Sequence, residues 1–168
     1  MADNFQIQLP VTAFIPAATN GPAQICLATY DRPALAFDDT TVETAQSFPV
    51  QVPAAYTGSG TLKLDLWYVM ASATTGSVAF RAYVEAVTSG DALDLDAADS
   101  YDSANQGNST VPGTAGYATK LSITLTNKDS LAAGDVVRIK LDRYATDGTN
   151  DTATGDARVL GCVLREEA

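Results

Sequence analysis

The 168-residue chain contains no histidine, and this absence excludes several common chemistries. The Ser-His-Asp and Cys-His catalytic arrangements both need an imidazole as general base, and zinc sites of the usual His-containing type need one as a ligand. The sequence also lacks the GxGxxG, Walker and GxSxG motifs of dinucleotide, phosphate and acyl chemistry. We therefore predict that the protein is not an enzyme.

One enzyme class needs only carboxylates, because a glycosidase works with two of them facing each other across a cleft. Carboxylates lie on or near strand-type runs at Asp65, Glu85, Asp142 and Glu43. Charged side chains on a solvated strand face are the ordinary explanation of such residues. A glycosidase therefore remains only a remote alternative.

Positive charge is also scarce, since 10 Lys and Arg residues stand against 20 Asp and Glu residues and the formal net charge is −10. Binding to nucleic acid needs clustered Lys and Arg, and an anionic membrane surface would repel such a chain. We expect neither nucleic acid nor membrane as a partner. High net charge keeps a protein soluble and its copies apart.

Long apolar runs are absent, and none approaches the roughly 20 residues that a membrane helix requires. The first residues, MADNFQIQLPVTAF, have neither a basic segment nor a continuous apolar segment. This pattern is not that of a secretory signal, and it predicts synthesis in the cytoplasm.

Cysteine is nearly absent too, with Cys26 in ICLATY and Cys162 in LGCVL. Neither has the CxxC spacing of a zinc or redox site. Each lies in a strand-type run, where a small buried apolar side chain is expected. A disulfide between them stays open, because it would require the two strands to be neighbours.

What the chain does contain is a series of strand patterns, the strongest of them between residues 61 and 87. TLKLDLWYVMA and VAFRAYVEAV both alternate apolar side chains on one face. Shorter runs of the same kind are FQIQL, QICLATY, SFPVQV, TKLSITLT, VVRIKLDRY and ARVLGCVLR. About eight or nine short strands separated by turn signals predict an all-β fold, a single-domain antiparallel β-sandwich of jelly-roll-like type. The two long strands are expected to be neighbours at its centre.

The two ends of the chain are candidates for contacts between subunits. Residues 1–15 are predicted to form an N-terminal arm or a first strand, and residues 16–168 the sandwich domain. The last strand, 157–165, is apolar on both faces at its middle, so it is either sandwiched within the domain or buried in an oligomer. The candidate interface residues at these ends are Phe5, Ile7, Leu9, Leu160, Cys162 and Leu164.

The stretch from Ser89 to Gly116 is acidic, small and polar, unlike the strands around it. A loop without regular structure longer than about 15 residues is uncommon in a compact domain and is usually functional or mobile. We predict such a loop here.

A second polar loop carries a candidate cation site. Asp147, Asn150 and Asp151 place two carboxylates and an amide within five residues, and Asp156 follows closely. Calcium takes several oxygen ligands of these types, but Asp, Asn and Gly are also the residues that any turn prefers. We expect no cofactor, with structural calcium at these four residues as the alternative.

Aromatic side chains suggest a different kind of binding. Trp67 and Tyr83 are predicted to lie on outward faces of adjacent strands, where rings with a polar group suit half-wet surfaces. Such a pair could stack against a sugar. Core and interface packing is the alternative, because strands are rich in aromatic residues.

The order of motifs resembles that of small structural proteins of tailed bacteriophages. In those proteins a "vP..Y..sg.l.l.l.w" strand precedes "a.sG.v.f...y", and VPAAYTGSGTLKLDLWYVMASATTGSVAFRAYVEAV is similar to this pattern. LAAGDVVRIKLDRYATDGTNDTATGDARVLGCVLRE resembles their "aGD.v.i.l.Rd..d..dT" ending. The likeness runs from Phe48 to the C-terminus, departing at Tyr144 and in the acidic stretch 91–116. It brings no catalytic residues.

This resemblance implies a jelly-roll-like protein of the virion, either a capsid decoration (cement) or head-fibre subunit or a tail-associated component. The implied partners are further copies of the chain, with a trimer as one arrangement, and the major capsid protein or another virion component. The alternative is a carbohydrate-binding β-sandwich module of a tail or host-attachment protein, whose partners would be cell-surface glycans. The same sandwich serves both functions.

Overall fold

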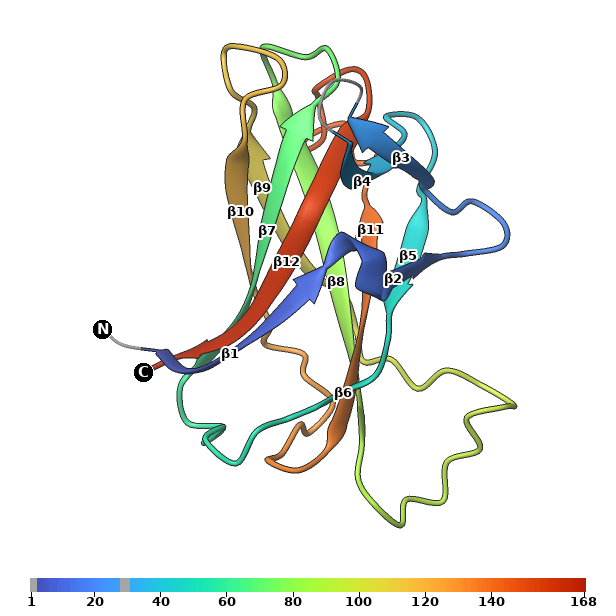
Figure 1. Cartoon of the computed structure of the whole chain (residues 1–168), viewed down its shortest axis with the longest axis vertical. Helices are drawn as coiled ribbons and strands as arrows, with labels where there is room; N and C mark the ends of the chain where they lie inside the picture. The colour runs from blue at the N-terminus through green and yellow to red at the C-terminus, as the bar shows by residue number, and fades with distance from the viewer. Residues whose placement is uncertain (1–2, 28–30) are drawn as a thin grey trace.

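The structure is a computed structural model that describes residues 3–27 and 31–168, and its strands form two antiparallel sheets packed face to face (Figure 1). The first sheet, which we call sheet A, has the order β10-β7-β12-β4-β3, with β1 also paired to β12. The second, sheet B, has the order β2-β5-β11-β8-β9, with β6 also paired to β11. The predicted all-β, jelly-roll-like sandwich is therefore confirmed.

The strands of sheet A are β1 (Asp3–Pro10), β3 (Ala23–Leu27), β4 (Arg32–Phe37), β7 (Thr61–Met70), β10 (Thr119–Thr124) and β12 (Ala157–Glu167). Those of sheet B are β2 (Phe14–Pro16), β5 (Thr44–Ser47), β6 (Val50–Gln51), β8 (Ser77–Val87), β9 (Asn105–Thr110) and β11 (Val136–Arg143). One 3-10 turn, η1 (Val11–Ala13), joins β1 to β2. Nowhere in the described residues is there a helix with the length and apolar character needed to cross a membrane.

The core lies between the sheets, where the predicted alternation places the apolar side chains. Leu64, Leu66 and Tyr68 of β7 are fully buried, as are Phe80 and other inward residues of β8. The Phe80 ring meets Phe37 of β4 edge to face at 5.4 Å between centroids. Each buried side chain of this size contributes roughly 1.5–3 kcal/mol to folding.

The two long strands β7 and β8 are not neighbours, and this part of the prediction is wrong. β7 pairs with β10 and β12 in sheet A, whereas β8 pairs with β9 and β11 in sheet B. Both strands carry a full apolar face, and packing these faces against each other across the sandwich buries them both. The connection from Ala71 to Gly76 therefore crosses from sheet A to sheet B instead of closing a hairpin within one sheet.

The two ends of the chain are built into sheet A, where β1 and β12 lie side by side (Figure 1). Leu9 stands opposite Cys162, and the core includes both of them together with Phe5 and Leu164. These four candidate interface residues are thus buried within one chain and are not available at its surface, while Ile7 and Leu160 are half-buried. The predicted boundary after residue 15 falls inside β2.

Two segments differ from the secondary structure that the sequence predicts. The predicted loop 89–116 contains β9, an edge strand of small and polar residues that shows no apolar alternation. The run SFPVQV is interrupted at Phe48 and Pro49, between β5 and β6, because proline has no N–H to donate to a ladder. These short strands bring the number in the described residues to twelve.

Candidate functional site

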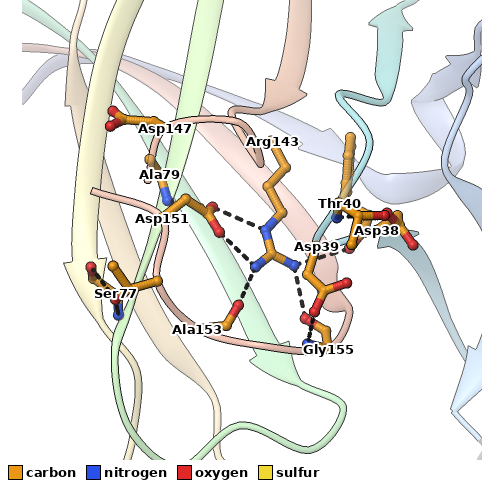
Figure 2. A network of polar contacts seen from close by, with 12 residues as sticks. Asp38, Asp39, Thr40, Ser77, Ala79, Arg143, Asp147, Asp151, Ala153 and Gly155 are labelled. Atoms are coloured by element: carbon orange, nitrogen blue, oxygen red, sulfur yellow. Dashed lines mark hydrogen bonds and ion pairs between the residues drawn. The ribbon is translucent and has the colours of Figure 1, made fainter. Parts of the chain in front are cut away.

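The candidate cation loop is organised around an arginine that the sequence did not single out (Figure 2). Arg143, at the end of β11, is fully buried and donates to both carboxylate oxygens of Asp151, at 3.0 and 2.8 Å. Its remaining N–H groups donate to the carbonyl oxygens of Ala153, Gly155 and Phe37. Asp151 is therefore the counter-ion of a buried guanidinium.

Of the other members of that predicted cation set, Asp147 and Asn150 bond to each other through their side chains, whereas Asp156 has other contacts. Asp147 accepts hydrogen bonds from the side chains of Asn150 and Gln106, and these bonds lower its pKa to about 2. Asp156 is half-buried, and its backbone oxygen accepts from Ala71. In residues 3–27 and 31–168 no group of three or more His, Cys, Asp or Glu could hold a metal ion. The structure thus does not unite these four residues as a ligand set, and calcium binding stays an untested prediction.

The outer face of sheet A carries an exposed tryptophan beside a groove. The alternation of β7 turns Leu66 and Tyr68 inward and leaves the Trp67 indole 44% exposed. A groove of about 330 Å³ lies against it, which we call the Trp67 groove. It is lined by Gln8, Leu9, Pro10, Trp67, Leu160, Gly161, Cys162 and Val163.

The groove lies beside an irregularity in β12. The register between β12 and β7 shifts between Val159 and Gly161, so that Leu160 is the extra residue of a bulge. Gly161 then stands opposite Trp67, and a Cβ placed on it would meet the backbone of Leu9 and Pro10, which line the same groove. Its φ of +154° is a conformation that side-chain-bearing residues rarely adopt. A glycine within a strand pattern was the sequence signal for this bulge.

Polar side chains stand beside the indole on the same face. Lys120 of β10 is the cross-strand partner of Trp67, and its ammonium lies 3.1 Å from the Asp65 carboxylate. Burial tends to raise the pKa of Asp65, but bonds from Ser122, Arg165 and Lys120 outweigh it and leave this pKa below its ordinary value. An exposed ring with ordered polar groups next to it suits a ligand that has both an apolar face and hydroxyl groups.

Tyr83 is not part of this surface, and the predicted pairing of Trp67 with Tyr83 is wrong. Tyr83 lies on β8, so the two aromatic side chains occupy the outer faces of different sheets. The Tyr83 ring instead has the Lys140 ammonium 4.4 Å from its centroid. Its hydroxyl donates to Asp142, and burial together with this carboxylate raises the pKa of Tyr83 to about 12.

The carboxylates considered for a glycosidase are engaged in ion pairs or in backbone contacts. Asp142 accepts two bonds from Arg81 at 2.8 and 2.9 Å, and Glu85 pairs with Arg138. Although burial opposes it, the bonds from Arg138 and Ser100 lower the pKa of Glu85, whereas a general acid needs a raised pKa. Burial does raise the pKa of Glu43, whose carboxylate accepts from a backbone N–H.

No protein-family model matches the chain, and no curated protein matches it in sequence. Solved structures match it in fold. The C-terminal CBM6 of LamC, a marine laminarinase from Zobellia galactanivorans, is 9% identical with a TM-score of 0.51, and the match covers 96% of this chain and 100% of that one. CsCBM6-3 from Clostridium stercorarium, solved with cellobiose, is 10% identical with a TM-score of 0.52, covering 98% and 94%.

A third match is the N-terminal CBM22-1-CBM22-2 tandem domain of Xyn10C from Paenibacillus barcinonensis, at 9% identity and a TM-score of 0.51. It covers 98% of this chain and 50% of that one, as expected for one domain of a tandem. This chain has the fold of these carbohydrate-binding modules. At such low identity the match concerns the fold.

The interpretation as a capsid-decoration or head-fibre subunit is overturned by these matches, because the three solved structures described above are carbohydrate-binding modules. Capsid partners have no support from them. The error came from a pattern of strands and turns, which many sandwiches share whatever they bind. The resemblance to phage proteins itself, and a location in a virion, are untested and stay predictions.

Proposed function

We propose that this protein is a non-catalytic carbohydrate-binding module that binds a glycan chain in the Trp67 groove. The observation that carries the proposal is the exposed Trp67 indole beside a groove on the outer face of sheet A. The apolar face of a pyranose ring would lie on the indole, while hydroxyl groups would meet Lys120 and Gln8. The likeness of the fold to modules of the CBM6 type supports this function.

Trp67 is the more suitable of the two aromatic candidates. No ring or cation lies against its indole in the described part of the chain, whereas the Tyr83 ring lies against Lys140. Open aromatic surface is what a sugar needs for stacking, because the contact gains by removing apolar area from water. The bulge at Gly161 lines the groove beside that surface.

The test uses the fact that Trp67 is the only tryptophan of the chain. Fluorescence excited at wavelengths that tyrosine does not absorb therefore reports on this groove alone. We expect a saturable change in emission when cello-oligosaccharides or laminarin oligosaccharides are added. Affinity gel electrophoresis with the corresponding polysaccharides in the gel measures the same binding without depending on the indole.

Replacing Trp67 by alanine should weaken retardation in these gels by at least about tenfold, which corresponds to about 1.4 kcal/mol. The matched control is Phe48→Ala, which removes a 50% exposed ring on the sheet B side and should leave retardation unchanged. If W67A is retarded as strongly as the unaltered chain, the glycan site lies elsewhere. If no polysaccharide of a broad panel retards the unaltered chain, the proposed function is contradicted.

A further inference from the structure

The outer face of sheet B carries a row in which tyrosine rings and cations alternate. Its members, in order, are Tyr101, Lys140, Tyr83, Arg81 and Tyr144, and we call it the tyrosine–cation row. The Lys140 ammonium lies 4.4 Å from the centroids of both Tyr101 and Tyr83. The Arg81 guanidinium lies 5.9 Å from Tyr83 and 3.9 Å from Tyr144.

Strand pairing fixes the middle of this row. Gln46 of β5, Lys140 of β11 and Tyr83 of β8 are consecutive cross-strand partners. Tyr101 comes from the segment 88–104, which is held on this face because the backbone N–H of Ser100 donates to the Glu85 carboxylate and that of Asp102 donates to the carbonyl of Val84. The position of Lys140 between two rings is therefore set by both the sheet and the segment that packs on it.

The cations of this face differ in their partners. Arg81 is neutralised by two bonds to Asp142, and Arg138 pairs with Glu85 and Asp99. Lys140 has no carboxylate within 4 Å in the described chain, and its contacts are the two ring faces. An aromatic face attracts an ammonium but does not neutralise it, so this half-buried charge keeps donors for a further partner.

A second donor lies directly beside it. Gln46 uses its side-chain oxygen to accept from Tyr101 and Arg138, at 3.4 and 3.5 Å. Its amide NH₂ group has no partner in the described chain, and Gln46 stands next to Lys140 across the ladder. An ammonium and an amide side by side are suited to the two oxygens of an anionic group.

We propose that Lys140 and Gln46, flanked by Tyr83 and Tyr101, form a second binding site that takes an anionic group carried on a sugar. The anionic group is a carboxylate or a sulfate on a saccharide ring, as in a uronic-acid or sulfated glycan. The ammonium and the amide bind the charged oxygens, and the edges of the tyrosine rings border the sugar. This site is on the opposite face from the Trp67 groove and does not depend on it.

The charge of the whole chain makes this inference testable. With a net charge of −10, the protein has no general attraction for polyanions. Binding of an acidic polymer must therefore come from a local site. Such binding should weaken as salt is added, because ions screen a single partly exposed charge.

The experiment is affinity electrophoresis and calorimetry with polygalacturonate, dextran sulfate and neutral dextran. We expect binding to one of the two acidic polymers and not to neutral dextran, and the polymer bound identifies carboxylate or sulfate as the group. Lys140→Gln should weaken binding at least about tenfold. The matched control is Lys128→Gln, which removes a lysine that also lies against a tyrosine ring, Tyr56, at 5.6 Å.

A second variant keeps the row intact. Gln46→Glu retains the oxygen that Tyr101 and Arg138 use but places a carboxylate beside Lys140, so it should abolish binding as well. Equal binding by K140Q and K128Q would overturn the proposal, as would failure of both acidic polymers to bind. Competition by inorganic sulfate alone at the same concentration as the polymer would show a simple anion site and would also overturn it.

The variant W67A separates this site from the proposed function. If the acidic site exists, W67A should bind the acidic polymer as the unaltered chain does. Loss of neutral-glycan binding with the acidic binding retained would support both sites independently. Loss of acidic binding in W67A would overturn the assignment to Lys140.

Discussion

At the scale of single residues, the most constrained side chain is Arg143. Its guanidinium is fully buried, and its N–H groups donate to the carboxylate of Asp151, to two carbonyls of the loop between β11 and β12, and to the carbonyl at the end of β4. Asp151 also accepts from the backbone N–H of Ala79 in β8 (Figure 2). This ion pair therefore ties the loop after β11 to both sheets.

Removing one member of a buried ion pair leaves the other charge without a partner, which typically costs about 3–5 kcal/mol. We expect Asp151→Ala to lower the free energy of unfolding by this amount, measured by urea denaturation. The control is Glu167→Ala, because Glu167 pairs with Lys63 and Arg165 where solvent reaches it and such pairs are worth about 0–1 kcal/mol. If D151A lowers the free energy of unfolding as little as E167A does, the Arg143 guanidinium must be hydrated in the variant, and the prediction is contradicted.

At the scale of elements, β12 organises sheet A because it pairs with β7 along one side and with β4 and β1 along the other. β1 covers the half of β12 from Gly161 to Glu167. It also brings Phe5 and Leu9 into the core. The same strand supplies Gln8 and Pro10 to the Trp67 groove.

Deleting residues 1–10 should therefore destabilise the domain and expose a sheet edge. Loss of the buried Phe5 and Leu9 side chains alone costs roughly 3–6 kcal/mol, at about 1.5–3 kcal/mol each. The uncovered edge of β12 is a template for pairing with other chains, so we expect aggregation in light scattering together with a lower urea midpoint. A deletion variant that stays monomeric with an unchanged midpoint would contradict this role of β1.

Most strands could be predicted from the sequence, but β9 could not. β7, β8, β11 and β12 alternate apolar and polar side chains, and this pattern follows directly from the two faces of a strand. β9 carries polar and small residues, because it lies at the edge of sheet B. Its Gly107 lies so close to Ile123 that a Cβ would come within 3.0 Å, a packing constraint that no local pattern reveals.

At the scale of the whole molecule, the distribution of titratable groups sets the response to pH. Without histidine, the chain has no side chain whose ordinary pKa lies between pH 5 and 8. The carboxylates with lowered pKa in the folded state are Asp38, Asp65, Glu85, Asp102, Asp147, Glu166 and Glu167. Glu43 is shifted in the opposite direction by burial.

Glu166 shows in which direction stability changes with pH. Burial opposes its ionisation, but bonds from Thr57, Asn4 and Gly60 lower its pKa from 4.5 to about 2. A carboxylate with a lowered folded pKa stabilises the protein above its unfolded pKa, and this stabilisation is lost as the pH falls toward the folded value. We expect the urea midpoint to be flat between about pH 5.5 and 7 and to fall between about pH 4.5 and 2.

The control is Glu166→Gln, which keeps the shape of the side chain but cannot ionise. It should be less stable at pH 7, and its midpoint should depend less on pH in the acid range. A midpoint that changes strongly between pH 7 and 5.5, or an acid response unchanged in E166Q, would contradict this account.

The candidate site was predictable only in part. The alternation of β7 places Trp67 outward, and a glycine within LGCV indicates a bulge, so both halves of the Trp67 groove left a signal in the sequence. That Gly161 stands opposite Trp67 depends on the pairing of strands about 90 residues apart, which no local pattern specifies. Arg143 and its partner Asp151 are only eight residues apart, but their ion pair could not be predicted because no local pattern shows that an arginine at the end of a strand is fully buried.

The amino-acid sequence is sufficient to predict that the protein is all-β, that the outer strand faces are mostly polar, and that imidazole-dependent chemistry is excluded. These properties follow from composition and from a period of two residues. Which strands share a sheet depends on the three-dimensional fold. That pairing placed Trp67 and Tyr83 on opposite faces, buried the apolar residues of β1 and β12 in one core, and left Lys140 with no carboxylate within 4 Å among the residues that the structure describes. Pairing between distant strands is governed by how their apolar faces pack, and this is a property of the whole chain.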